Sequence, residues 1–452
     1  MQFSKDFIWG VATSSYQIEG AASIDGKGPC IWDTMCQEKG RILDGSSGEV
    51  ACDHYHRYEE DCKLMQKLGI THYRFSTDWS RILPDGVGAV NEKGLQFYSD
   101  LVDCMLAHGI TPYLTLYHWE LPTALHYKGG FLNEDMPNWF ADYTEIVAKK
   151  LGDRVKHYFT INEPQCVIGL GHDTGEHAPG IIYPVAAQFR MSHMLMKAHG
   201  MAVQRLRAIV PDAVVGYAPT CSPICPETED DIDIARQCFF SYPADGSSPC
   251  WHPAWFSDPV MLGKYGEEAL RLYGQWLPKG FENDLPIISQ PIDIYAQNIY
   301  NSRTIHRDHT SPLGYAMTER KIGAGKTAIQ WPITPEALYW GPRFLYERYK
   351  KPIYITENGM SAHDVVSLDG KVHDPNRIDF LHRYLLALQR AITDGVDIRA
   401  YFQWSLLDNF EWAKGYTDRF GIVYVDFETQ ERIIKDSGYW YQQVIATNGN
   451  SL

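Results

Sequence analysis

Thr160-Ile161-Asn162-Glu163-Pro164 and Ile355-Thr356-Glu357-Asn358-Gly359 are the two stretches that decide the fold of this 452-residue chain. Each places a glutamate next to an asparagine, directly after an apolar run that is typical of a buried β-strand. The parallel strands of a closed barrel all end at one mouth, where the active sites of such barrels lie. We therefore expect the carboxyl groups of Glu163 and Glu357 to meet at one end of a barrel.

Strand-like and helix-like segments alternate along the whole chain. The expected strands are short and almost continuously apolar, and they cover residues 8–14, 72–76, 111–117, 156–161, 213–218, 292–298, 352–356 and 398–404. Amphipathic helices are expected at 58–68, 92–108 and 377–393 and after Met136, whereas Gly341-Pro342 is expected to split the helical segment before the seventh strand. This alternation predicts an α/β fold, a single (β/α)8 TIM barrel spanning 1–452, with elaborated βα loops at 219–259 and 300–332.

Composition and charge restrict the class of protein. The formal net charge is −15 and the isoelectric point is near 5.6, which argues against nucleic acids and anionic membranes as partners. The apolar run at residues 7–12 is too short for the core of a signal peptide, and no window has the length of a membrane span. We expect a cytoplasmic protein, and the choice between monomer and homo-oligomer stays open.

The ten cysteines are too sparse for a disulfide scaffold. Cys221, Cys225, Cys238 and Cys250 lie close together in a proline-rich stretch, but their spacing fits no standard zinc pattern. Buried thiols are the preferred interpretation, with a disulfide or a zinc site as the alternative. We predict neither a metal nor a cofactor.

Paired carboxyl groups a few ångströms apart are the machinery that cleaves a glycosidic bond. The ends of the other expected strands are also polar or aromatic, and they include Arg74, the run Tyr117-His118-Trp119 and Trp404. Amide, imidazole and carboxylate groups can satisfy sugar hydroxyls, and indole rings can stack on the C–H faces of a sugar. These residues predict a carbohydrate site at the mouth of the barrel.

The chain resembles the β-glucosidases of glycoside hydrolase family 1 over nearly its whole length. The resemblance rests on strings that occur in the family's order: Phe7-Ile8-Trp9-Gly10, Tyr117-His118-Trp119-Glu120-Leu121-Pro122, the two glutamate stretches, Asn409-Phe410-Glu411-Trp412, Arg419-Phe420-Gly421-Ile422 and Lys435-Asp436-Ser437. It implies a retaining exo-β-glycosidase that removes terminal β-D-glucosyl residues from oligosaccharides or from aryl and alkyl glucosides, with β-galactosidase or β-fucosidase side activity.

The same resemblance assigns roles to individual residues. Glu357 would be the nucleophile, Glu163 the acid/base, and Arg74 and Tyr300 the groups that support the nucleophile. The implied substrate-binding residues are Gln17, His118, Trp119, Asn162, Asn298, Trp331, Trp404, Glu411, Trp412 and Phe420.

Two alternatives remain. A 6-phospho-β-glucosidase would act on a phosphorylated sugar, although the retained Glu411-Trp412 pair favours a neutral one. The other alternative is a non-catalytic sugar-binding barrel, which family members that lack one glutamate can become; both glutamates are present here. The chain departs from the family pattern at Ala296-Gln297-Asn298-Ile299-Tyr300 and carries extra charge at residues 171–177, which leaves the preferred aglycone open.

Overall fold

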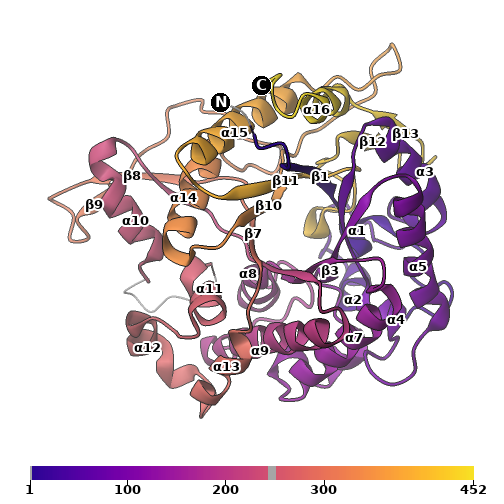
Figure 1. The fold of residues 1–452 in the computed structure, drawn as a ribbon, viewed down its shortest axis with the longest axis horizontal. Coiled ribbons are helices and arrows are strands. Elements are labelled where there is room, and N and C mark those ends of the chain that lie inside the picture. Colours follow the sequence, from indigo (N-terminus) through magenta and orange to yellow (C-terminus); the bar gives the residue numbers. More distant parts are fainter. Residues whose placement is uncertain (1–2, 243–250) are drawn as a thin grey trace.

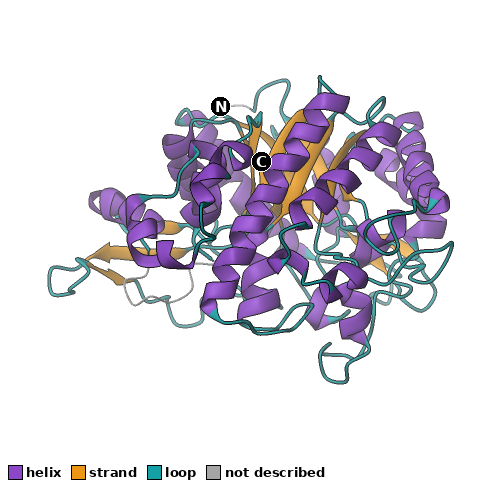
Figure 2. Cartoon of the chain, turned by 90° about the horizontal axis from the view of Figure 1, so that it is seen from below, coloured by secondary structure: helices purple, strands orange, loops and turns teal. Residues whose placement is uncertain are grey.

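The computed structural model describes residues 3–242 and 251–452 of the chain. Within these residues eight parallel strands close into a barrel, in the order β1-β11-β10-β7-β5-β4-β3-β2, and helices surround it (Figures 1 and 2). The barrel strands are β1 (Ile8–Ala12), β2 (His72–Ser76), β3 (Thr111–Tyr117), β4 (His157–Asn162), β5 (Val214–Ala218), β7 (Ile294–Asn298), β10 (Ile353–Asn358) and β11 (Ile398–Trp404). The predicted (β/α)8 barrel is confirmed.

The longer helices pack around the outside of the barrel because each has one apolar face. They are α3 (His54–Lys67), α5 (Glu92–Ala107), α7 (Met136–Leu151), α9 (Val185–Ile209), α14 (Ala337–Tyr349), α15 (Pro375–Thr393) and α16 (Asp436–Ala446). In α5, the predicted stripe that includes Leu95, Leu101 and Met105 is buried. The shorter helices are α1 (Ser15–Ile18), α2 (Ile31–Cys36), α4 (Trp79–Ile82), α6 (Thr123–Tyr127), α8 (Pro164–Ile168), α10 (Ile232–Phe240), α11 (Pro253–Leu262), α12 (Glu267–Tyr273) and α13 (Leu285–Ile288).

Aromatic side chains fill the inside of the barrel. The ring of Phe402 packs edge-on against Tyr113, with 5.0 Å between the ring centroids, in a buried cluster that also contains Phe159. Gly10 in β1 leaves room for Phe402, because a Cβ at that position would lie 2.5 Å from the ring. The interior is therefore a packed core, and open space for a ligand is left to the mouth.

The two long βα loops fold together instead of remaining separate excursions. Strand β6 (Ile224–Pro226) comes from the first loop, and β8 (Arg303–Arg307) and β9 (Tyr315–Met317) come from the second. They form a small three-stranded sheet, which projects to one side of the barrel in Figure 1. A separate hairpin of β12 (Val423–Val425) and β13 (Arg432–Ile434) follows β11.

The expected break at Gly341-Pro342 is wrong, because α14 continues through both residues. Pro342 removes one backbone donor, but Leu338, Phe344 and Leu345 around it are fully buried and hold the helix on the core. Gly341 has a packing role, since a Cβ there would lie 2.6 Å from Cγ of Pro223. The first strand also ends two residues earlier than expected, where α1 begins after Ser14.

The cysteines near the long loops are free thiols where the structure describes them. Cys221 and Cys225 are buried and Cys238 is partly buried, whereas Cys250 lies outside the described residues. Among the helices of the described residues, none combines the length and the apolar character that a membrane span requires.

Candidate active site

The polar strand ends meet at one mouth of the barrel. Glu357 lies in β10 opposite Asn298, the last residue of β7, and Glu163 directly follows β4. Gly359 allows the end of β10 to approach β11 closely, because a Cβ there would lie 1.7 Å from the carbonyl oxygen of Trp404. Both glutamates are buried, with 7% of Glu163 and 4% of Glu357 exposed.

An arginine and a tyrosine hold the carboxylate of Glu357. Nη1 of Arg74 donates to Oε1 at 2.6 Å, and the hydroxyl of Tyr300 donates to Oε2 at 2.7 Å. Burial raises the pKa of Glu357, while the charge of Arg74 and the hydrogen bonds of Arg74 and Tyr300 oppose that rise. Both oxygens of Glu357 therefore have donors that favour the ionised carboxylate.

Glu163 has weaker partners. Nδ2 of Asn298 donates to Oε1 at 2.7 Å, and the thiol of Cys166 donates to Oε2 at 2.9 Å. Burial raises the pKa of Glu163 to about 7, and the negative charge of Glu357 adds to the rise. The carboxyl of Glu163 is therefore protonated in a large fraction of molecules near neutral pH. Different environments are what give paired carboxyls different protonation states.

The side-chain amide of Asn298 links the two carboxyl groups. It donates to Glu163 and also lowers the pKa of Glu357 through a hydrogen bond. The hydroxyl of Thr356 donates to Oδ1 of Asn298 at 2.7 Å and fixes the orientation of the amide. Carboxyl groups that share one amide lie only a few ångströms apart, and cleavage with retention needs a separation of about 5 Å.

Asn162 connects Arg74 to a histidine. Its Oδ1 accepts from Nη2 of Arg74 at 2.6 Å, and its Nδ2 donates to Nε2 of His118 at 3.1 Å. Burial and the charge of Arg74 lower the pKa of His118, so its ring is neutral. If Nε2 accepts, the proton is on Nδ1, which has no partner in the described part of the chain. This buried donor is available to a hydroxyl group of a ligand.

A second polar group joins Gln17, Asn409 and Glu411. Nε2 of Gln17 donates to Oδ1 of Asn409 and to the carbonyl oxygen of Phe410, both at 2.9 Å, and lies 3.4 Å from Oε2 of Glu411. Burial, followed by the charges of Asp418 and the two other glutamates, raises the pKa of Glu411. Glu411 thus shares the low-dielectric pocket of Glu163 and Glu357.

Two aromatic groups complete the site. His118 stacks with Trp404 and with Trp412, at centroid distances of 5.7 and 6.1 Å, and Trp119 lies 4.7 Å from Trp412. The other group joins Tyr300, Trp331 and Phe420, with centroid distances between 5.1 and 6.2 Å. The structure thus brings every residue of the predicted site into one region.

Three site residues have left-handed backbone conformations. The φ angles are 86° at Trp119, 41° at Glu163 and 51° at Trp412. Non-glycine residues in this region cost on the order of 1–3 kcal/mol and persist only where the surroundings fix them. Their concentration at the mouth is typical of a functional site.

Two contacts of the site were not predicted from the sequence. The thiol of Cys166 contacts Glu163, and the side chain of Asn409 orients Gln17. The spacing of three residues between Glu163 and Cys166, at the start of a helix, is a signal that could have indicated the first contact.

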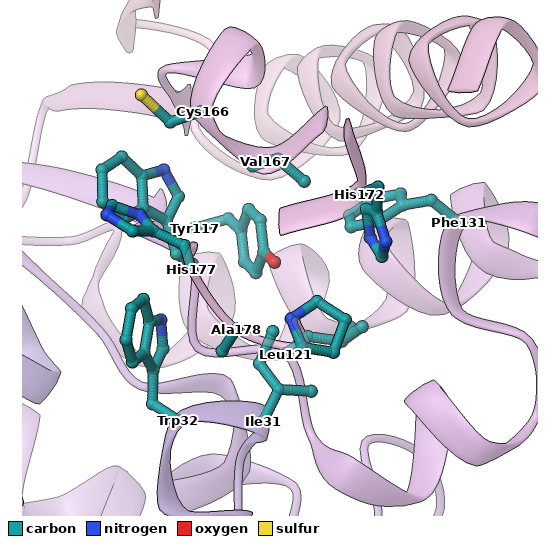
Figure 3. Close-up of a pocket in the computed structure, with 12 residues that line it drawn as sticks. Ile31, Trp32, Tyr117, Leu121, Phe131, Cys166, Val167, His172, His177 and Ala178 are labelled. Carbon is teal, nitrogen blue, oxygen red and sulfur yellow. The ribbon is translucent and has the colours of Figure 1, made fainter. Parts of the chain in front are cut away.

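A small, mostly apolar cavity lies beside the site, and neither Glu163 nor Glu357 lines it (Figure 3). It borders the site through Trp119 and Cys166. Its other lining residues are Ile31, Trp32, Tyr117, Leu121, Phe131, Val167, His172, His177, Ala178 and Pro179.

The sequence matches the model of glycosyl hydrolase family 1 over residues 1–450. The chain belongs to this family. It is 48% identical to β-glucosidase A of Acetivibrio thermocellus, with 99% of each chain covered. It is 40% identical to the bifunctional β-D-glucosidase/β-D-fucosidase of Bifidobacterium breve, over 99% of this chain and 98% of that protein. The solved structure of the Thermotoga maritima β-glucosidase in complex with deoxynojirimycin superposes with a TM-score of 0.90, at 44% identity and 99% coverage of both chains.

Proposed function

We propose that this family 1 enzyme is a retaining β-glucosidase in which Glu357 is the nucleophile and Glu163 the acid/base. The observation that supports these roles is the unequal environment of the two carboxyls. Arg74 and Tyr300 donate to Glu357, whereas burial and the nearby charge of Glu357 raise the pKa of Glu163 to about 7. One carboxyl is suited to attack and the other to donate a proton.

In the first step a carboxylate oxygen of Glu357 bonds to the anomeric carbon. The bond from that carbon to the leaving oxygen breaks, and Glu163 gives its proton to the leaving oxygen. In the second step Glu163 takes a proton from water, the water oxygen bonds to the anomeric carbon, and the ester bond to Glu357 breaks. Two inversions at one carbon retain the β configuration.

The charge of Glu357 couples the two steps. When Glu357 becomes an ester its negative charge disappears, and with it one cause of the raised pKa of Glu163. Glu163 then loses its proton more readily, as the second step requires of a base. In the ester, Tyr300 and Arg74 no longer face a charged carboxylate at Glu357.

The proposed substrate is a terminal, non-reducing β-D-glucosyl residue of a short oligosaccharide or of an aryl or alkyl glucoside. Asn162, His118 and Glu411 would bind its hydroxyls, with Asn162 at the 2-hydroxyl, where the contact strengthens in the transition state. The remaining binding residues in this proposal are Gln17, Trp119, Asn298, Trp331, Trp404, Trp412 and Phe420. The neutral His118 and the buried Glu411 suit a neutral sugar, and β-fucoside or β-galactoside side activity is expected.

Replacement of Glu357 by Ala tests the nucleophile. Turnover of p-nitrophenyl β-D-glucoside should fall by roughly 10⁴-fold or more, and added azide should yield the α-glucosyl azide. A β-azide product, or turnover that persists, would refute the role of Glu357. A wild-type enzyme that prefers 6-phosphoglucosides, or that binds glucosides without turnover, would refute the proposed substrate or the proposed activity.

A further inference from the structure

The thiol of Cys166 contacts Glu163, the proposed acid/base, but takes no part in the two proposed steps. Cys166 is the third residue of α8, and its backbone N–H donates to the carbonyl oxygen of Glu163 at 2.9 Å. Its thiol donates to Oε2 of Glu163, also at 2.9 Å, and only 7% of the residue is exposed. The same helical turn therefore fixes both residues and the distance between their side chains.

Asn298 and Cys166 differ in what they can do when the proton of Glu163 leaves or returns. Nδ2 of Asn298 can only donate, so it favours the ionised carboxylate. A thiol can donate to a carboxylate through S–H, and its sulfur can accept from the O–H of a carboxylic acid. Cys166 can thus keep contact with Glu163 in both protonation states that a double displacement requires.

We propose that Cys166 is a positioning residue for Glu163, one that orients the carboxyl in both its acid and its base form. The proposal rests on the acid/base role given to Glu163 above. Cys166 borders the apolar cavity beside the site, and its sulfur points away from the centre of that cavity (Figure 3). This direction fits a thiol that acts on the carboxyl and not on a ligand in the cavity.

Other ionisable groups also face Glu163, and the test must separate their effects. The charges of Glu357 on β10 and Arg74 on β2 affect the pKa of Glu163. The charge of Glu163 in turn affects the pKa values of three other groups, namely Tyr300 after β7, Glu411 after β11 and Cys221 after β5. Cys221 is a second buried thiol, near enough to Glu163 for the carboxylate charge to affect it. Its backbone N–H donates to the carbonyl oxygen of Asn298. It therefore provides a matched control.

The experiment is the pH dependence of kcat/KM for p-nitrophenyl β-D-glucoside, whose basic limb reports the acid of the free enzyme. Cys166→Ala removes the contact in both forms of Glu163, but the bond from S–H to the charged carboxylate is the stronger of the two, so this limb should move upward by about half to one pH unit. Cys166→Ser, which can donate and accept, should return the limb to the wild-type position. Cys166→Val fills the space without a hydrogen bond and should shift the limb as Ala does, so that the result does not depend on one variant folding.

Cys221→Ala should leave the basic limb in place, because it removes a buried thiol of the same volume without removing the contact to Glu163. An unmoved limb in the Ala and Val variants would overturn the proposal. An equal shift in Cys221→Ala, or a Ser variant that behaves as Ala does, would also overturn it. The variant Glu163→Gln is measured in parallel: if its basic limb persists, the acid/base role itself fails, which separates that failure from the failure of the Cys166 proposal.

Discussion

The raised pKa of Glu163 predicts that the residue destabilises the fold at neutral and alkaline pH. A carboxyl whose pKa is raised on folding binds its proton more tightly in the folded state. Stability is then lost as the pH rises from the ordinary value of 4.5 to the folded value of about 7, and the loss is constant above that. Glu163→Gln, which keeps the size and removes the charge, should therefore stabilise the protein while it abolishes proton donation.

The expected gain follows from the shift. A rise from 4.5 to about 7 corresponds to roughly 3 kcal/mol at pH 9 and almost nothing at pH 4. The entropy of unfolding of a 452-residue chain is about 1 kcal/mol per kelvin, so the gain in Tm is about 3 °C at pH 9. The Gln side chain retains both contacts, because its oxygen can accept from Asn298 and its nitrogen can donate to the sulfur of Cys166.

Scanning calorimetry at a fixed heating rate, at pH 4, 5.5, 7 and 9, measures the difference in Tm between Glu163→Gln and the wild type. The exposed Glu319→Gln serves as the control for loss of one negative charge, and its difference should stay near zero throughout. If the difference in Tm between Glu163→Gln and the wild type does not grow with pH, or is negative at pH 9, then ionisation of Glu163 does not destabilise the fold and the inference is refuted.

Three further perturbations act on the groups around the site. Arg74→Met removes the cation beside Glu357 and should lower kcat/KM by roughly 10²–10³-fold and move the acid limb of its pH profile upward; a profile with an unchanged acid limb contradicts this. Tyr300→Phe removes the donor to Oε2 of Glu357 and should move the acid limb upward by up to about one pH unit, and a downward shift would count against the contact. Lys435→Met removes the ammonium partner of Asp408 at 2.7 Å and leaves Arg419, at 2.8 Å, as its remaining cation. The change should cost about 1.5–3 kcal/mol, or about 1.5–3 °C in Tm by calorimetry, and an unchanged Tm would show that the Lys435–Asp408 pair does not stabilise the fold.

The sequence predicted the barrel, and it predicted that the candidate site residues meet at one mouth, because both depend on a simple rule. The carboxyl ends of parallel strands converge whatever the helices and loops do, so Asn162, Asn298 and Glu357 had to meet once their strands were recognised. The sequence strings around Glu163 and Glu411 then gave the identities of the remaining partners. No detailed model of packing was required for either step.

The features that were missed depend on packing between distant segments. Strands β6 and β9 have three residues each, too few for a recognisable pattern, and they form only because two long loops lie side by side. The continuous helix through Pro342 results from burial on both sides of the proline, which a propensity argument does not include. The contact between Cys166 and Glu163 depends on the left-handed backbone of Glu163, which redirects the chain at the start of α8.

The unequal environments of the two glutamates follow from where one cation lies. Glu163, Glu357 and Glu411 are all buried in the same mouth, and burial alone would raise the pKa of each. Arg74 extends from β2 and binds Glu357 directly, whereas it reaches Asn162, the neighbour of Glu163, and not Glu163 itself. Because the attraction of a charge falls with distance, Arg74 opposes the rise in the pKa of Glu357 more strongly than the rise in the pKa of Glu163. Two chemically identical side chains on β10 and at the end of β4 thus have different environments because Arg74 contacts only one of them directly.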